Sequence, residues 1–287
     1  MRYRLVSLLS RLPFWWLYRL SDLIFFLVYR VFGYRRKVVL QNLKNSFPHF
    51  DEKQRKATAK GFYRNLCDIL VETLKGLTIS KQELLARVEI EGDHYLTDAL
   101  KNGQSVMALT SHLCNWEWML LGLAAKTGGP TVGVYQILKN PWGEELMKKI
   151  RTRFGSEAVA RGRIVRQMVA WRKTPKLYGM VADQSPKANE NLSYFWQEFM
   201  HQETGFQRGP AVLAPKLQMA VMYLSMERTS RGHYRIRVQP MRYPPFDSRE
   251  EDPSILSEYA RRLQADLEKQ PANWLWSHRR WKKKLMG

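Results

Sequence analysis

The sequence contains little cysteine: Cys67 and Cys114 are the only two in 287 residues. Two cysteines cannot build the disulfide framework of a small secreted domain, and neither they nor the six histidines have the spacing of a metal-binding motif. We therefore expect no metal and no bound cofactor. We interpret Cys114 as a small buried apolar residue rather than a nucleophile.

Acidic residues are also scarce. There are 26 Asp and Glu against 47 Lys and Arg, which gives a formal net charge of +21 and a pI of about 10.1. A surplus of this size favours anionic partners. The candidates are nucleic acid, a membrane with acidic lipids, a phosphorylated glycolipid and an acidic carrier protein.

No long apolar run is free of charge. Phe14 to Val31 is long enough to cross a bilayer, but it contains Arg19, Asp22 and Arg30. Each charge at mid-bilayer costs roughly 2.5–3.5 kcal/mol on insertion scales. Because Arg19 and Asp22 are three residues apart, we expect them to pair on one helical face. Residues 1–34 are predicted to form a membrane-associated helix, either a single span or a helix lying in the interface.

Alanine is missing from the start of the chain. None precedes Ala57, and no small-residue cleavage site is visible, which argues against a cleaved signal peptide. We expect residues 35–287 to form one further domain, since 45% of the chain is apolar and no repeat or low-complexity tract divides it.

Strands and helices alternate in that region. The expected strands are 88–91, 105–110, 131–135, 177–181, 221–226 and 234–239, with an extended segment at 193–199. The expected helices are 38–47, 52–75, a short helix after Ser80, 115–126, 142–154, 164–171, 210–217 and 254–270. Asp51 and Ser80 are the expected capping residues of two of them. The alternation predicts an α/β fold with a mixed, mostly parallel central sheet and helices on both faces.

His112 follows one expected strand and Glu117 lies five residues later. On a single helix the two side chains would be about 140° apart. They can meet only if His112 ends the strand and Glu117 begins the helix that Asn115 caps. Glu117 would then hold one ring nitrogen of His112 and leave the other to take a proton from an alcohol. The alternative is a turn histidine and a solvated helix residue.

Polar residues also follow two other expected strands. Tyr135 ends the strand 131–135, and Asp183 and Gln184 follow the strand 177–181. In parallel sheets, ligands gather at the carboxyl ends of the strands. Taken alone, the second group fits equally well as a capped turn.

Several motifs together resemble those of the late acyltransferases of lipid A assembly, the bacterial lauroyl and myristoyl transferases. The His112-x4-Glu117 spacing is similar to the histidine-acid motif of these enzymes. The other matching stretches are Asn42-Leu43 with Phe47-Pro48, Val134-Tyr135 with Asn140-Pro141 and Arg151 or Arg153 before Phe-Gly155, Asp183-Gln184, and Trp274-x-Trp276-x-His278-Arg279-Arg280-Trp281-Lys282. The resemblance runs from about residue 38 to residue 282. It departs from the family at Gln136, Ser185 and Pro186, where the family often has arginine, an acid and glycine.

The resemblance implies acyl transfer from an acyl carrier protein thioester to a hydroxyl of a lipid A precursor or another anionic lipid. His112 would be the general base and Glu117 would orient it, while Arg153 or Arg208 would stabilise the oxyanion or bind a lipid phosphate. Asp183, Gln184 and Tyr135 would support the site or bind the head group. The resemblance also implies a location on the cytoplasmic face of the bacterial inner membrane.

Three other functions fit parts of the sequence. A lysophospholipid or aminolipid acyltransferase would use the same histidine-acid pair. A membrane-bound scaffold would explain the charge and the N-terminus, but not the polar residues at strand ends. A nucleic-acid-binding protein would use basic residues interleaved with aromatics, as in Trp274 to Lys284. No nucleic-acid-binding motif is found, so we expect no nucleic-acid partner.

Overall fold

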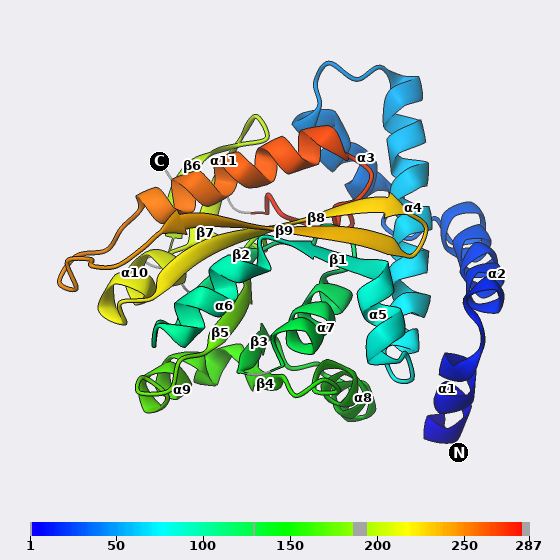
Figure 1. The fold of residues 1–287 in the computed structure, drawn as a ribbon. Helices are drawn as coiled ribbons and strands as arrows, with labels where there is room; N and C mark the ends of the chain where they lie inside the picture. Colours follow the sequence, from blue (N-terminus) through cyan, green and yellow to red (C-terminus); the bar gives the residue numbers. More distant parts are fainter. Residues whose placement is uncertain (1, 129, 186–193, 283–287) are drawn as a thin grey trace.

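The computed structural model describes residues 2–128, 130–185 and 194–282. Its helical elements are α1 (Arg2–Arg11), α2 (Phe14–Phe25), η1 (Phe26–Val31), α3 (Arg36–Ser46), α4 (Glu52–Lys75), α5 (Lys81–Arg87), α6 (Asp93–Lys101), α7 (Trp116–Thr127), α8 (Pro141–Arg151), η2 (Arg161–Arg163), α9 (Ile164–Ala170), α10 (Gly209–Lys216) and α11 (Ser254–Lys269). Its strands are β1 (Val88–Glu91), β2 (Val106–Thr110), β3 (Thr131–Tyr135), β4 (Glu157–Ala160), β5 (Leu177–Val181), β6 (Tyr194–Phe199), β7 (Gln202–Gln207), β8 (Ala220–Ser230) and β9 (His233–Arg242). Figure 1 shows their arrangement.

Local sequence signals set several helix starts. The Asp51 carboxylate accepts a hydrogen bond from the Gln54 N–H, and the Gln54 side chain accepts one from the Asp51 N–H, so a capping box opens α4. The Ser80 hydroxyl accepts from the Glu83 N–H at the start of α5, and the Asn115 side chain accepts from the Trp118 N–H at the start of α7.

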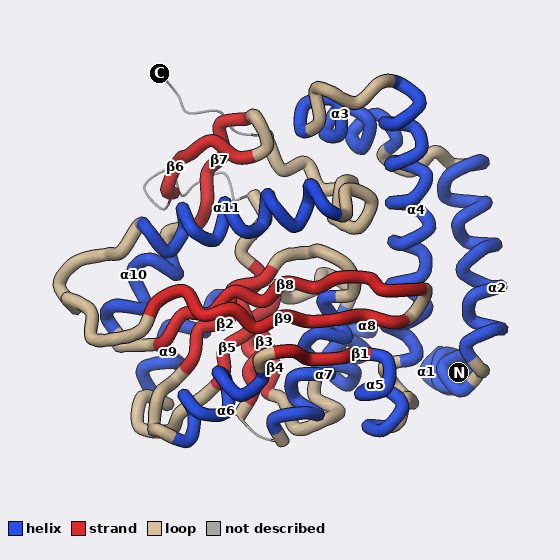
Figure 2. Tube along the Cα trace, turned by 45° about the horizontal axis from the view of Figure 1, so that its top comes forward, coloured by secondary structure: helices blue, strands red, loops and turns tan. Residues whose placement is uncertain are grey.

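Within the described residues, seven strands form the main sheet in the order β1-β9-β8-β2-β5-β3-β4. Only the β8–β9 pair is antiparallel; the other five pairings are parallel. The strands β8, β2, β5, β3 and β4 therefore point the same way, and their carboxyl ends meet at one edge (Figure 2). This confirms the predicted mixed, mostly parallel sheet.

Helices cover both faces of the sheet, as predicted. Figure 1 shows α11 on one side of the strands and α7 on the other. The helix α7 packs closely on β3, because a Cβ added at Gly133 would come within 2.6 Å of Leu120. Trp118 on α7 is fully buried, as are Tyr223 on β8 and Tyr259 on α11, which places the core between these layers.

The sequence analysis missed three features. It did not anticipate α6 or β4, which are short, with nine and four residues. The segment from Tyr194 to Phe199 is extended, as expected, but it pairs with β7 in a separate antiparallel hairpin. Ser193, the first residue of the predicted segment, lies outside the described residues.

The N-terminal region is not one continuous helix. Pro13 separates α1 from α2, and α2 continues into the π-helical turn η1. No helix among the described residues combines the length and the apolar character that a membrane crossing requires. The predicted boundary after residue 34 stays a prediction.

Polar contacts hold α2 against the rest of the molecule. The Ser21 hydroxyl donates to Asp68 on α4 at 2.6 Å, and the Tyr18 hydroxyl donates to Glu72 at 3.1 Å. The predicted pairing of Arg19 with Asp22 is wrong: the Asp22 carboxylate pairs with Arg231 at 2.7 Å. The polar side chains of α2 thus find their partners in distant parts of the chain. The rule used for the prediction considers only pairs within one helix.

Candidate functional site

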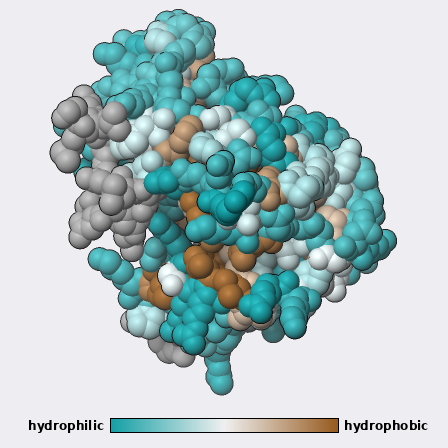
Figure 3. Space-filling view, turned by 90° about the vertical axis from the view of Figure 1, so that its left-hand side faces the viewer, coloured by the Kyte–Doolittle hydropathy of each residue, from teal (hydrophilic) through white to brown (hydrophobic). Residues whose placement is uncertain are grey.

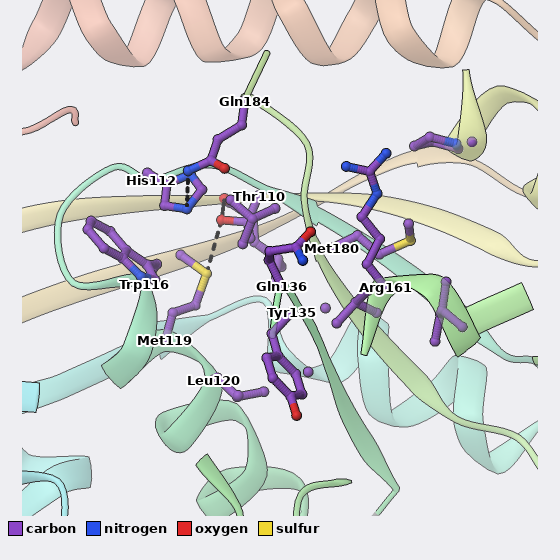
Figure 4. Close-up of a pocket in the computed structure, with 18 of the residues that line it drawn as sticks. Thr110, His112, Trp116, Met119, Leu120, Tyr135, Gln136, Arg161, Met180 and Gln184 are labelled. Atoms are coloured by element: carbon purple, nitrogen blue, oxygen red, sulfur yellow. Dashed lines mark hydrogen bonds between the residues drawn. The ribbon is translucent and has the colours of Figure 1, made fainter. Parts of the chain in front are cut away.

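A cavity of about 610 Å³ opens where the carboxyl ends of the parallel strands meet. The register explains which residues gather there. Thr110 pairs with Val181, so the residues two positions beyond each strand end, His112 and Asp183, fall side by side. Figure 4 shows the residues that line the cavity, with His112 on one side and Arg161 on the other.

Two hydrogen bonds join His112 to Asp183. The Nδ1 atom of His112 lies 2.7 Å from Asp183 Oδ1, and the His112 backbone N–H donates to Oδ2 at 2.8 Å. The His112 ring also makes an edge contact with Trp116, at 4.9 Å between centroids. The imidazole is therefore held from two directions, with its Nε2 edge toward the cavity.

Asp183 is 2% exposed, and its charge is compensated within the protein. Its Oδ2 atom also accepts a hydrogen bond from the Trp274 indole N–H at 2.7 Å. Burial alone would raise the pKa of the Asp183 carboxyl, but the charge and hydrogen bonds of His112, with that of Trp274, hold the pKa below its ordinary value. Asp183 is thus an ionised partner for the imidazole.

The turn that carries His112 is fixed from both sides. Cys114 adopts a left-handed conformation, with φ of 55°, and its N–H donates to Asn273 O at 2.9 Å. Leu113 forms an isolated β-bridge with Trp274. On the other side, the Asn115 side chain donates to buried Glu72 at 2.8 Å. These contacts hold the three residues that follow His112 in place, and with them the backbone that carries the imidazole.

Gln184 lies against the second ring nitrogen. Its Nε2 atom is 3.1 Å from His112 Nε2, a contact visible in Figure 4. An amide nitrogen donates, so this contact fits the neutral ring with its proton on Nδ1, facing Asp183. In that tautomer His112 Nε2 is a base directed into the cavity.

The loop after β5 is braced by the C-terminal segment. Burial lowers the pKa of His278 to about 4, so this ring is neutral. Its Nε2 atom accepts a hydrogen bond from the Ser185 N–H at 3.2 Å. The Ser185 hydroxyl donates to the carbonyl of Arg280. The bracing keeps Asp183 and Gln184 in place around His112.

Glu117 does not contact His112, which corrects the predicted orienting role. Its carboxylate receives two hydrogen bonds from Arg151, at 2.9 Å from Nε and 2.5 Å from Nη2. The predicted placement was right, since His112 follows the strand and Glu117 lies on the first turn of α7. The carboxylate nevertheless points toward α8, where a buried guanidinium offers a bidentate partner.

Arg151 and Arg161 are the two arginines that line the cavity, and Arg151 is the one that contacts Glu117. Both Glu117 and Arg151 line it, and the guanidinium lies over the Tyr135 ring at 5.0 Å. Burial lowers the pKa of Arg151, but the hydrogen bonds and charge of Glu117 outweigh it and raise the pKa overall. Its Nη1 atom makes no hydrogen bond to any residue that the structure describes.

Tyr135 lines the cavity as predicted for a substrate-binding residue, but its hydroxyl is occupied. It donates to Glu144 at 2.5 Å. Burial and then the facing Glu144 raise the pKa of Tyr135. The ring, rather than the hydroxyl, is the surface that Tyr135 offers near Arg151.

The two arginines predicted to stabilise an oxyanion are directed elsewhere. Arg153 donates to Gly76 O at 2.9 Å, and Arg208 makes two hydrogen bonds to Glu251, at 3.0 and 2.6 Å. Neither is among the residues that line the cavity. The geometry therefore does not support the role assigned to them from the motif.

Most of the cavity wall is apolar. The side chains include those of Met119, Leu120, Leu123, Leu177, Met180 and Leu213. Figure 3 shows the face that carries α9 and α10, where hydrophobic side chains gather near the middle. Among the described residues, no three His, Cys, Asp or Glu side chains are grouped so that they could hold a metal ion.

Sequence reasoning missed two members of the site. Trp274 was noted only as part of the C-terminal motif, and Arg151 only as an alternative to Arg153 in a matched block. Nothing in their local sequence says that one donates to Asp183 and the other to Glu117, because each contact spans a large sequence separation.

Comparison with known proteins gives the family of the chain. No curated protein matches the chain. The family described as bacterial lipid A biosynthesis acyltransferase matches residues 3–283, nearly the whole chain. With an imidazole-carboxylate pair beside an apolar cavity at the strand ends, the chain belongs to the bacterial lipid A biosynthesis acyltransferase family.

Proposed function

We propose that the protein transfers a fatty acyl chain from an acyl carrier protein thioester to a hydroxyl of a lipid A precursor, with His112 as the general base. The observation that carries the proposal is the pair of contacts at His112, which lines a mostly apolar cavity: Asp183 holds Nδ1, and the Gln184 amide lies against Nε2. Membership of the family supports the reaction class.

The proposed step begins with His112 Nε2 taking the proton of the acceptor hydroxyl. The oxygen attacks the thioester carbonyl carbon and forms a tetrahedral oxyanion. When this collapses, the C–S bond breaks and the imidazolium returns its proton to the leaving thiolate, giving an ester and a free thiol. Asp183 stabilises the imidazolium while it carries the extra proton.

Two donors are candidates for the oxyanion. The Gln184 amide already lies next to His112 Nε2, and Arg151 lines the cavity while Glu117 holds its Nε and Nη2 atoms. A donor positioned before the reaction stabilises the developing charge at little reorganisation cost. In this proposal Glu117 acts through Arg151 and not through His112.

The apolar wall of the cavity is suited to the acyl chain. Each methylene buried there contributes about 0.8 kcal/mol to binding. Gly133 and Gly179, on adjacent strands, both line the cavity, so the backbone itself forms part of the wall. The acyl chain would thus lie along the strand ends, with its thioester near His112.

We also propose that the N-terminal helices attach the protein to the cytoplasmic face of the inner membrane. The outer surface of α2 and η1 exposes large apolar side chains, among them Trp15, Trp16, Leu23, Phe26 and Phe32. Exposed aromatics with flanking arginines favour the membrane interface. The acidic carrier protein and anionic lipid would both be attracted by the net charge of +21.

The test is a transfer assay with the full chain in detergent, using acyl carrier protein that bears a labelled acyl group. We expect the label in the lipid A precursor, measured by mass spectrometry. If label appears only in added lysophospholipid, the acceptor proposal is wrong and the alternative acyltransferase applies. If no lipid is acylated, the proposed function fails.

Membrane attachment has a separate test. Replacing Trp15 and Trp16 by serine should weaken binding to acidic vesicles, because both rings are more than half exposed. The control replaces Tyr243 by serine, since Tyr243 follows β9, is 50% exposed and belongs to neither the N-terminal helices nor α9. Equal vesicle binding by the wild type and the double variant would contradict the proposed attachment.

A further inference from the structure

The rim of the cavity carries four cations for which the described part of the chain provides no hydrogen-bond or ion-pair partner. Residues 158–182 contain six basic residues and no acidic one. Arg163 and Arg166 are exposed, as are Arg172 and Lys173 just after α9. None of these four side chains makes a hydrogen bond or an ion pair with any residue that the structure describes. Their charge is therefore available to an external partner.

Several arginines in another part of the fold are neutralised within the protein. On β8 and β9, Arg228 pairs with Asp68, Arg235 with Glu89, and Arg237 with both Glu91 and Glu227. The four cations around α9 differ in this respect from the arginines of β8 and β9.

Apolar side chains are exposed between these cations. Val165 and Val169 on α9 are 51% and 43% exposed, and Ile137 and Leu138, after β3, are 54% and 42% exposed. Val165 lines the cavity, as does Gln136 next to Ile137, so the two segments belong to its mouth. We call these two segments, 137–139 and 163–173, the rim.

The rim continues toward the N-terminal helices. Figure 1 shows α9, α8 and α1 along the same edge of the molecule. Lys149 of α8 lies over the Tyr3 ring of α1 at 4.2 Å, which joins α8 to α1. On α1, Leu5 and Leu8 are each 60% exposed. Exposed apolar side chains therefore occur at both ends of this edge, on α9 and on α1.

We propose that the rim is a second membrane-contacting surface, which binds an acidic lipid bilayer and brings the cavity mouth to the lipid. Apolar side chains interleaved with arginine and lysine are the pattern of proteins that lie in the interface of anionic membranes. The inference rests on the proposed function in one respect: an acceptor that is itself a lipid must pass from the bilayer into the cavity. An acidic carrier protein would use the charges alone, and the four exposed apolar side chains favour lipid.

The first experiment measures sedimentation of the full chain with vesicles of phosphatidylcholine and phosphatidylglycerol in equal parts. Each cation near such a surface changes affinity about fivefold, so replacing Arg163 and Arg166 by glutamine should weaken binding about 25-fold. The matched control replaces two exposed lysines on α3 and α4, Lys44 and Lys53, and should change binding little. Equal loss in both variants would overturn the proposal, since it would show only general attraction of charge.

The second experiment tests the apolar part with Ile137→Ser and Val169→Ser, neither of which lines the cavity. We expect severalfold weaker vesicle binding, and slower transfer to an acceptor embedded in vesicles but unchanged transfer in detergent. If both rim variants bind vesicles as the wild type does but have a raised KM for acyl carrier protein, the rim docks the carrier and the proposal is wrong. Vesicle binding needs no turnover, so failure of the proposed function would leave this test intact.

Discussion

Asp183 and Glu117 are both buried acids beside the same cavity, but their partners differ. Asp183 faces His112 and receives hydrogen bonds from Trp274 and from the His112 backbone. Glu117 faces Arg151 and makes two hydrogen bonds to its guanidinium. One acid thus orients an imidazole, a side chain that can act as a base, while the other fixes a guanidinium cation.

The spacing of two residues in a motif therefore does not identify the hydrogen-bond partner of either residue. The His-x4-Glu spacing places both residues at the cavity, yet the orienting carboxylate comes from the end of a neighbouring strand. We infer that the residues at the strand ends carry out proton transfer, and that the residues of α7 and α8 supply the positive charge that contacts the substrate. The following predictions test that division, beginning with the largest expected effect.

His112→Ala should reduce kcat about 10³-fold, because it removes the proposed base. Its backbone N–H still donates to Asp183, so the fold should persist. The measurement is single-turnover acyl transfer, with circular dichroism as the control for folding. Activity within tenfold of the wild type would end the general-base assignment.

Asp183→Asn should reduce kcat about 100-fold with little change in KM, since the imidazolium loses its anionic partner. The effect on stability depends on pH. Because the pKa of Asp183 is lowered in the folded protein, its ionised form stabilises the fold at neutral pH, and this stabilisation is lost as the pH falls below about 4. Urea unfolding should show the largest difference between variant and wild type near pH 7. A constant difference down to pH 3 would show that its charge contributes no stability.

Arg151→Met should reduce kcat/KM about tenfold to 100-fold through loss of a donor to the substrate. It also leaves Glu117 as a buried carboxylate without its cation, at a cost of about 3 kcal/mol in the free energy of unfolding. Combining it with Glu117→Leu should restore most of the stability but none of the activity. If the double variant regains activity, Arg151 has only a structural role.

Glu117→Gln should reduce kcat/KM about tenfold, less than either change at the strand ends. The amide keeps one acceptor for Arg151, so the guanidinium is displaced rather than lost. Kinetics of this variant separate the two regions directly. A loss as large as that of His112→Ala would contradict the division between proton transfer and charge.

Trp274→Phe should have the smallest effect, with kcat lowered severalfold. The ring packing is kept, but Asp183 loses one charge-assisted hydrogen bond, worth about 1.5–3 kcal/mol. Trp276→Phe provides a matched control, because its indole N–H donates to Pro271 O, away from the site. If both variants lose equal activity, Trp274 acts through packing alone.

Much of the fold could be predicted from the sequence because its signals are local. The strands 131–135 and 177–181 were predicted at their observed bounds, and the Asp51 capping box opens α4 as expected. The missed elements, such as β4, are too short to show a periodic pattern of hydrophobic residues. The N-terminal helices were predicted as one although Pro13, which separates α1 from α2, is a local signal. The π-helical turn and the ion pair of Asp22 with Arg231 depend on the rest of the molecule.

The sequence by itself determined that His112 ends a buried strand and that polar residues follow the neighbouring strands. The periodicity of apolar residues and the capping of helices each involve only a few neighbouring residues, so both can be recognised in the sequence. Two contacts become visible only in the tertiary structure: Asp183, 71 residues away, faces the imidazole, and Arg151 donates hydrogen bonds to Glu117. Those pairings follow from strand order and register, which bring together groups that no local pattern relates.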